Sequence, residues 1–248
     1  MSYMFSYSKA TTIDLSSFDT SNVTNMDSMF YGSTATTLDL SSFDTSNVTN
    51  MHGIFWNSAA TTLDVSKFDT SKVTDMSSMF EGSTATTLDL SSFDTSKVTN
   101  MSRMFDSSAA TTIDLSSFDT SNVTVMFYMF AQSAATILDL SNFDTSKVTD
   151  MGWMFYRSAA TTLDLSSFDT SNVTNMIGMF RNSNVLKTIY AGDNFNTNAV
   201  TSSSNMFYNT TNLVGGAGTK YNASHIDKTY ARIDGGTSLP GYFTLKNN

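Results

Sequence analysis

The chain has 248 residues and a formal net charge of −9, and Glu81 is the only glutamate among its 22 acidic residues. This acidity disfavours a nucleic-acid ligand, which requires a basic face, and the lack of cysteine excludes disulfides and thiolate chemistry. No apolar run reaches the ~18 residues of a membrane span, and residues 1–5 lack the basic start and apolar centre of a signal peptide.

A 25-residue pattern recurs along the chain, of the form T-T-L-D-L-S-S-F-D-T-S-N-V-T-N-M-x-x-M-F-x-x-S-x-A. Such a period is typical of a solenoid. We divide the chain into tandem repeats at 1–185, with a partial first repeat at 1–10, and a segment of degenerate repeats with a C-terminal capping module at 186–248. Because the chain begins within a repeat, we expect it to be a fragment of a longer protein. The phenylalanine of the Met-Phe pair recurs without a slip at Phe30, Phe55, Phe80, Phe105, Phe130, Phe155 and Phe180.

Each repeat begins with a segment that alternates polar and apolar residues. In residues 37–41, Leu38 and Leu40 would face a core while the other side chains face water, which predicts a short strand of a parallel sheet. The Asp-Thr-Ser turn follows, where the carboxylate can accept hydrogen bonds from nearby backbone N–H groups. Apolar residues at 48, 51, 54 and 55 then share one face of a short helical or 3₁₀ turn. Small residues return the chain to the next strand.

One repeat cannot fold alone, because it buries too few apolar side chains to offset the conformational entropy of ordering 25 residues. Neighbouring coils must cover each other's open ends, so stability is the sum of repeat and interface contributions, and both ends need caps. We therefore expect successive coils to stack in register.

The pattern L-D-L-S-S-F-D-T-S-x-V-T-x-M-x-x-M-F closely resembles the repeat of the BspA-like leucine-rich class of bacterial surface proteins. Residues 186–190, 213–216, 230–234 and 241–244 are similar to that family's drifted last strand and terminal module. The resemblance implies a leucine-rich-repeat-like solenoid with one short parallel strand and one short helical or 3₁₀ turn per coil. It also implies a secreted or wall-attached protein that adheres to host proteins, mucosa or other microbes. The chain departs from the class in having serine where relatives often carry cysteine, in a repeat one residue shorter, and in lacking a wall-sorting motif.

Two rows of aspartate follow the repeat, and they contain most of the acidic residues. The outer row lies in the predicted strand face and the turn row in the Asp-Thr-Ser turn. A linear Ca²⁺ site is the functional alternative, but one carboxylate per coil offers few ligands, and the glycine-rich Ca²⁺ turns of other solenoids are missing. We expect an exposed polar face and local backbone caps instead, with no metal site and no cofactor. The rows are Asp14, Asp39, Asp64, Asp89, Asp114, Asp139 and Asp164, and Asp19, Asp44, Asp69, Asp94, Asp119, Asp144 and Asp169.

The positions at which the repeats differ flank the Met-Phe pair. Because the scaffold is fixed elsewhere, these positions are free to be selected for contact with a partner, and their side chains should point away from the core. Aromatic residues with arginine recur in binding hot spots and in exposed apolar patches. Neutral variation, or packing against a domain outside this fragment, is the alternative interpretation. The candidate ligand-binding residues are Phe127, Tyr128, Trp153, Tyr156, Arg157 and Trp56.

The sequence offers little for catalysis. His52 and His225 lie in unrelated contexts, and serine and aspartate are so abundant that a chance triad carries no weight. We therefore expect no enzyme. Lys72 with Asp75, and Lys147 with Asp150, are predicted to form local surface ion pairs.

We predict a non-enzymatic adhesin module at the bacterial cell surface, which presents one face of the solenoid to a host extracellular protein or glycan, or to another bacterial surface. We expect no nucleic-acid partner and no membrane insertion. The alternatives are a structural stalk or self-associating element, and a module whose assembly depends on Ca²⁺.

Overall fold

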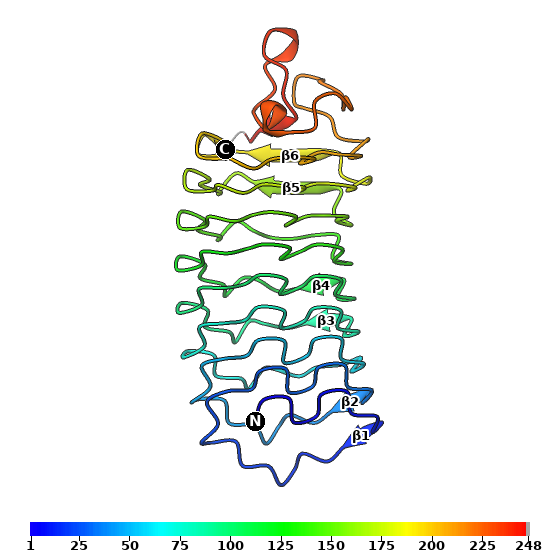
Figure 1. Ribbon diagram of the computed structural model, residues 1–248, viewed down its shortest axis with the longest axis vertical. Helices are drawn as coiled ribbons and strands as arrows, with labels where there is room; N and C mark the ends of the chain where they lie inside the picture. Colours follow the sequence, from blue (N-terminus) through cyan, green and yellow to red (C-terminus); the bar gives the residue numbers. More distant parts are fainter. Residues whose placement is uncertain (247–248) are drawn as a thin grey trace.

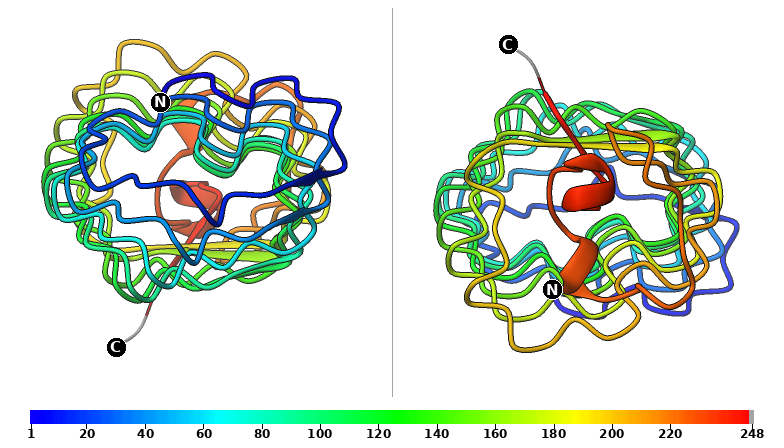
Figure 2. Two further views of the ribbon diagram at one scale, coloured as in Figure 1. Left: turned by 90° about the horizontal axis from the view of Figure 1, so that it is seen from below. Right: turned by 90° about the horizontal axis from the view of Figure 1, so that it is seen from above.

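The computed structural model describes residues 1–246, so the last two residues of the predicted capping segment, Asn247 and Asn248, lie outside the described residues. The chain winds as a stack of coils that forms a rod, with the N-terminus at one end and the C-terminal segment over the other (Figure 1). Viewed along the rod, successive coils superpose as one flattened ring (Figure 2). The predicted solenoid is confirmed. Between residues 1 and 246, no helix has the length and apolar character needed to cross a membrane.

Short parallel strands lie on one side of the rod and pair one repeat apart. Thr12 pairs with Thr37, Thr87 with Thr112, and the longer strands pair over four residues each. The Leu and Ile side chains point inward while the threonines face solvent, as the alternating pattern predicts. The strands are β1 (Thr12–Ile13), β2 (Thr37–Leu38), β3 (Thr87–Leu88), β4 (Thr112–Ile113), β5 (Thr162–Leu165), β6 (Thr188–Ala191) and β7 (Phe243–Leu245).

The opposite side of each coil consists of successive turns rather than a continuous 3₁₀ helix. The N–H of Met29 bonds to the carbonyl of Met26 at 3.2 Å, as it would in a 3₁₀ helix, but the N–H of Phe30 bonds to Ile54 of the next coil at 2.9 Å. A continuous 3₁₀ helix cannot form here because Ser28 and Gly32 have φ of +53° and +62°. A left-handed residue every four positions interrupts a helix. Every second backbone N–H of the segment, such as that of Phe30, therefore donates to a carbonyl of the next coil.

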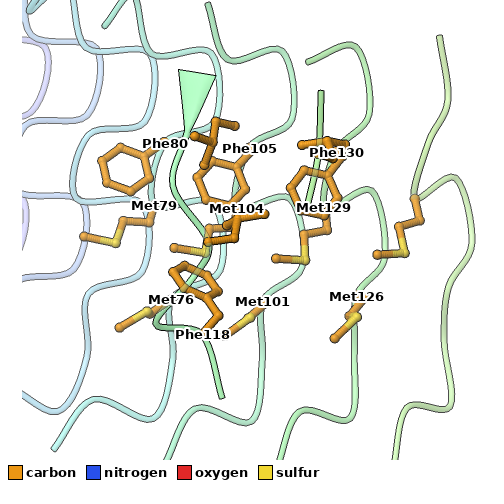
Figure 3. Close-up of a cluster of buried hydrophobic side chains, with 14 of the residues drawn as sticks. Met76, Met79, Phe80, Met101, Met104, Phe105, Phe118, Met126, Met129 and Phe130 are labelled. Atoms are coloured by element: carbon orange, nitrogen blue, oxygen red, sulfur yellow. The ribbon is translucent and has the colours of Figure 1, made fainter. Parts of the chain in front are cut away.

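A column of phenylalanine rings forms the axis of the core. The rings of the Met-Phe pairs stack one coil apart, with centroids separated by 5.4–6.0 Å and planes within 15° of parallel. Two rows of buried methionine run beside the column (Figure 3). Each coil therefore repeats the packing of the one before. The column contains Phe5, Phe30, Phe55, Phe80, Phe105, Phe130, Phe155, Phe180 and Phe207.

Buried threonines connect the turns of adjacent coils. The hydroxyl of Thr95 donates to the carbonyl of Asp119 at 2.8 Å and accepts from the N–H of the same residue at 2.8 Å. Thr95 is fully buried, and this one hydroxyl satisfies two backbone groups of the neighbouring coil.

The C-terminal segment covers the last coil. Strand β7 pairs in parallel with β6, and two short 3₁₀ helices, η1 (Lys228–Tyr230) and η2 (Gly236–Ser238), precede it. The ring of Tyr242 is fully buried and packs edge-on against Phe207, with centroids 5.0 Å apart. The carboxylate of Asp234 accepts hydrogen bonds from the N–H groups of Ala217 and Thr219, which fixes the loop before it. This arrangement closes the apolar end of the solenoid.

Candidate binding surface

Five of the six candidate residues lie together on the turn side of the rod. Tyr128 and Trp153, on adjacent coils, stack with ring centroids 5.5 Å apart. Tyr156 lies edge-on to Trp153 at 5.2 Å, and Phe127 lies edge-on to Tyr128 at 4.6 Å. The guanidinium of Arg157, which is exposed, lies 5.2 Å from the centroid of the Tyr156 ring. The four rings are only partly exposed. They therefore form a flatter surface than rings that project fully into solvent would form.

Two further arginines, which the sequence interpretation did not select, complete this surface. Arg103 lies 4.4 Å from the centroid of Tyr128. Arg181 lies 5.3 Å from Trp153 and 4.9 Å from Tyr208, which is 45% exposed. Each pair has the geometry of a cation–π contact. We call the whole set the aromatic stripe: Arg103, Phe127, Tyr128, Trp153, Tyr156, Arg157, Arg181 and Tyr208.

The repeat itself contained a signal for one of these arginines. Arg103, Tyr128 and Trp153 occupy the same position of three successive repeats, and all three have φ between +58° and +59°. A residue in this left-handed conformation directs its side chain along the rod toward its equivalents. Equivalent variable positions in neighbouring repeats should therefore have been considered as stacked pairs.

The sixth candidate, Trp56, lies in a separate stack nearer the N-terminus. Its ring lies 4.3 Å from that of Tyr31, which in turn lies 4.6 Å from that of Tyr7. Trp56 therefore shares the side of the rod with the aromatic stripe but contacts none of its rings.

A partly buried charge cluster separates the two stacks. Arg103 Nη1 lies 2.9 Å from Asp106 Oδ2 and 3.7 Å from Glu81 Oε1. Burial raises the pKa of Glu81, although Ser78 and Arg103 oppose the shift, and burial likewise raises the pKa of Asp106 against Ser107 and Arg103. The second oxygen of Glu81, Oε2, is buried without a hydrogen bond in the described part of the chain. The cluster holds Arg103 in place and neutralises its charge.

The turn row of aspartates forms the local caps that the sequence predicts, and the outer row, predicted only as an exposed polar face, forms caps of the same kind. In the outer row, Asp89 Oδ1 accepts from the N–H and hydroxyl of Ser91; in the turn row, Asp94 Oδ1 accepts from those of Ser96. Hydrogen bonds from the serine hydroxyl, and then from its N–H, lower the pKa of both carboxyls. No group of three or more His, Cys, Asp or Glu side chains suited to a metal occurs within residues 1–246.

The predicted lysine–aspartate ion pairs are wrong. Lys72 Nζ donates instead to Asn47 Oδ1, and Lys147 Nζ to Asn122 Oδ1, each at 2.7 Å. The partner lies at the equivalent position of the preceding coil, because the stacking distance between coils is shorter than the path along the chain.

His52 does not belong to a catalytic triad. Its Nδ1 lies 2.7 Å from the hydroxyl of Ser77, and that hydroxyl donates to Asp75 Oδ1 at 2.5 Å. In a Ser-His-Asp triad the carboxylate orients the histidine and the histidine accepts the serine proton. Here the carboxylate accepts that proton directly, which leaves the serine unactivated.

The fold and this surface define a leucine-rich-repeat-like solenoid, in which one side of the rod carries the strands and the other carries the variable residues. The chain belongs to the family described as Mycoplasma protein of unknown function, DUF285, which matches residues 1–86, 57–163 and 132–240. No curated protein matches the chain. Among solved structures, the functional domain of InlJ from Listeria monocytogenes, which includes a cysteine ladder, is 17% identical with a TM-score of 0.22. That match covers 96% of this chain and 55% of the InlJ chain, so the present chain spans about half the length of that structure.

Proposed function

We propose that the chain is a non-enzymatic binding module of a bacterial cell-surface protein, and that the aromatic stripe holds a host extracellular protein or glycan, or another bacterial surface. The observation that carries the proposal is the stacking of Tyr128, Trp153 and Arg181 at variable positions of an otherwise invariant scaffold. Tryptophan, tyrosine and arginine supply most of the binding energy in many interfaces. The resemblance of the repeat to that of BspA-like surface proteins supports the location.

The test uses the whole chain on arrays of purified extracellular-matrix proteins and of glycans. Trp153→Ala and Tyr156→Ala should each weaken binding about tenfold or more, which corresponds to ~1.4 kcal/mol. Trp56→Ala is the matched variant, because it removes the same type of ring from the separate stack with Tyr31. Binding that survives both stripe substitutions would contradict the site, and selective loss in Trp56→Ala would assign binding to the other stack.

The surface location is tested on intact cells that carry the parent protein. Proteolysis from outside should degrade an epitope inserted in this chain while a cytoplasmic control protein stays intact. Protection of the epitope would contradict the proposal.

A further inference from the structure

One part of the aromatic stripe carries positive charge that no acidic neighbour neutralises. Within residues 1–246 the ion pairs involve Arg103 and Lys246, whereas Arg157 and Arg181 form none. Among the described residues, the guanidinium of Arg157 forms one hydrogen bond, to Gln132 Oε1 at 3.5 Å. The buried Nε of Arg181 has no hydrogen-bond partner in the described part of the chain. In a chain with a net charge of −9, these two guanidinium groups attract an anion to this part of the stripe.

The faces of the two central rings of the stripe are already occupied. Tyr128 lies between Arg103 and Trp153, and Trp153 lies between Tyr128 and Arg181. At Tyr128 and Trp153 a ligand therefore meets the edges of the rings and of the guanidinium groups rather than the ring faces. These edges carry polar groups, namely the hydroxyls of Tyr128, Tyr156 and Tyr208 and the indole N–H of Trp153. Among residues 1–246 these groups form no hydrogen bond, whereas the hydroxyls of Tyr221 and Tyr242 do.

Three hollows on the surface of the described chain lie away from the stripe. They are lined by strand-face and cap residues such as Thr112, Tyr190 and Lys246. A protein partner with a large apolar anchor would need a pocket to bury it, and the stripe offers none of these hollows. A flat ligand rich in hydroxyl groups matches the ring edges better.

We propose that the aromatic stripe binds an acidic glycan, with a sugar carboxylate held by the guanidinium groups of Arg157 and Arg181. These two residues lie on adjacent coils, where the N–H of Arg157 bonds to the carbonyl of Arg181 at 3.0 Å. A guanidinium binds a carboxylate through two parallel N–H bonds, and the phenol and indole groups hydrogen-bond the sugar hydroxyls. This inference rests on the proposed binding function and names its ligand class.

The experiment measures binding of the whole chain to three polymers: polygalacturonate, its methyl ester, and polyglutamate. Polygalacturonate should bind at least about tenfold more tightly than the uncharged methyl ester, because charge-assisted hydrogen bonds are worth that much or more. Arg157→Gln and Arg181→Gln should each remove most of the difference. Lys97→Gln is the matched control, since it removes one positive charge from an exposed side chain elsewhere on the rod. Arg181→Lys keeps the charge but loses the fork, and should also weaken binding.

The melting temperature of each variant separates loss of binding from loss of folding, and Arg157, which is exposed, gives a variant whose fold does not depend on the side chain. Equal binding of polygalacturonate and its ester, or equal loss in Lys97→Gln, would overturn the inference. Tighter binding of polyglutamate would overturn it in favour of an acidic polypeptide. If a protein or glycan from the arrays still binds through Trp153 while polygalacturonate does not bind, the assignment of an acidic glycan is wrong but the proposed binding function stands. If no partner depends on Trp153, the proposed function fails as well.

Discussion

The indole ring of Trp153 lies directly over Gly178, the residue at the same repeat position one coil further on. A Cβ atom built on Gly178 would stand 2.8 Å from two atoms of the indole ring, and φ at Gly178 is +59°. The glycine therefore makes room for the tryptophan, and the ring can lie flat along the rod only because its neighbour has no side chain.

Gly178→Ala should lower the free energy of unfolding by about 1–3 kcal/mol, since it combines a steric clash with a left-handed backbone. Gly53→Ala is the matched control, because Gly53 has φ of +55° at the same repeat position and its added Cβ would meet nothing closer than Ser28 Oγ at 3.2 Å. Thermal unfolding of both variants checks the prediction. Equal losses would show that backbone strain alone, without the ring of Trp153, sets the effect.

The phenylalanine column should be most sensitive in its middle. Phe105→Ala should cost about 3–5 kcal/mol, as is typical for a fully buried ring whose cavity cannot collapse. Phe5→Ala, at the same repeat position in the first coil, should cost less because Phe5 is only partly buried. Denaturant unfolding followed by circular dichroism gives both values. A loss at Phe5 as large as that at Phe105 would contradict the end effect expected of a one-dimensional stack.

The buried threonine hydroxyls should contribute to stability through the backbone groups that they satisfy. Thr95→Val keeps the shape of the side chain but leaves the N–H and carbonyl of Asp119 without their partner, and should cost about 1–3 kcal/mol. Thr99→Val should change stability by less than about 0.5 kcal/mol, because Thr99 is exposed and its hydroxyl reaches Thr74 only at 3.3 Å. Urea unfolding of the two variants provides the comparison, and equal effects would exclude a special role for the buried row.

Acid should destabilise the solenoid through the aspartate caps. Hydrogen bonds from Ser91 hold the pKa of Asp89 in the folded chain below its ordinary value of 3.8. The folded state then binds the proton less tightly than the unfolded state, so this stabilisation is complete above about pH 4 and is lost as the pH falls through the folded pKa. Serine hydrogen bonds lower the pKa in the same way, with the same sign of effect, at Asp14, Asp19, Asp39, Asp44, Asp64, Asp69, Asp94, Asp114, Asp139 and Asp144.

Ser91→Ala tests this cap at one position. It should raise the pKa of Asp89 toward 3.8, as followed by NMR titration of the assigned carboxyl resonance, while the unbonded neighbour in Ser92→Ala should leave it unchanged. The melting temperature of the parent chain should fall below about pH 4. Stability that rises on acidification would mean that relief of the raised pKa values at Glu81 and Asp106 dominates instead.

The repeat determines most of the fold because it specifies the same packing many times. Leu38 and Leu40 are predicted to face the core from their alternation alone, and Asp94 is predicted to cap its turn from the Thr-Ser pair that follows it; the structure confirms both. The turns around Met29 could not be distinguished from a 3₁₀ helix by apolar spacing, because both bring the same side chains inward. Only the positive φ angles separate the two, and serine or arginine at these positions gives no sign of them.

The aromatic stripe was predictable in composition and only partly in geometry. Trp153 and Tyr156 can be selected by residue type. Including Arg181 in the stripe requires knowing the direction in which its side chain lies. The same limit explains Lys72, whose partner Asn47 lies 25 residues away in sequence but on the adjacent coil. Contacts between variable positions become visible only when the register and direction of stacking are known.

The glycines that contact large side chains of the preceding coil restrict which coils can be neighbours. Tyr7 is followed one period later by Gly32, Asn57 by Gly82, and Trp153 by Gly178, and in each case a Cβ on the glycine would collide with the larger residue. Where no glycine follows, the larger side chains must stack, as Tyr128 and Trp153 do. Repeats that look interchangeable in an alignment are therefore matched to their neighbours, and exchanging the coil of Gly178 for one with a side chain at this position would force the ring of Trp153 to move.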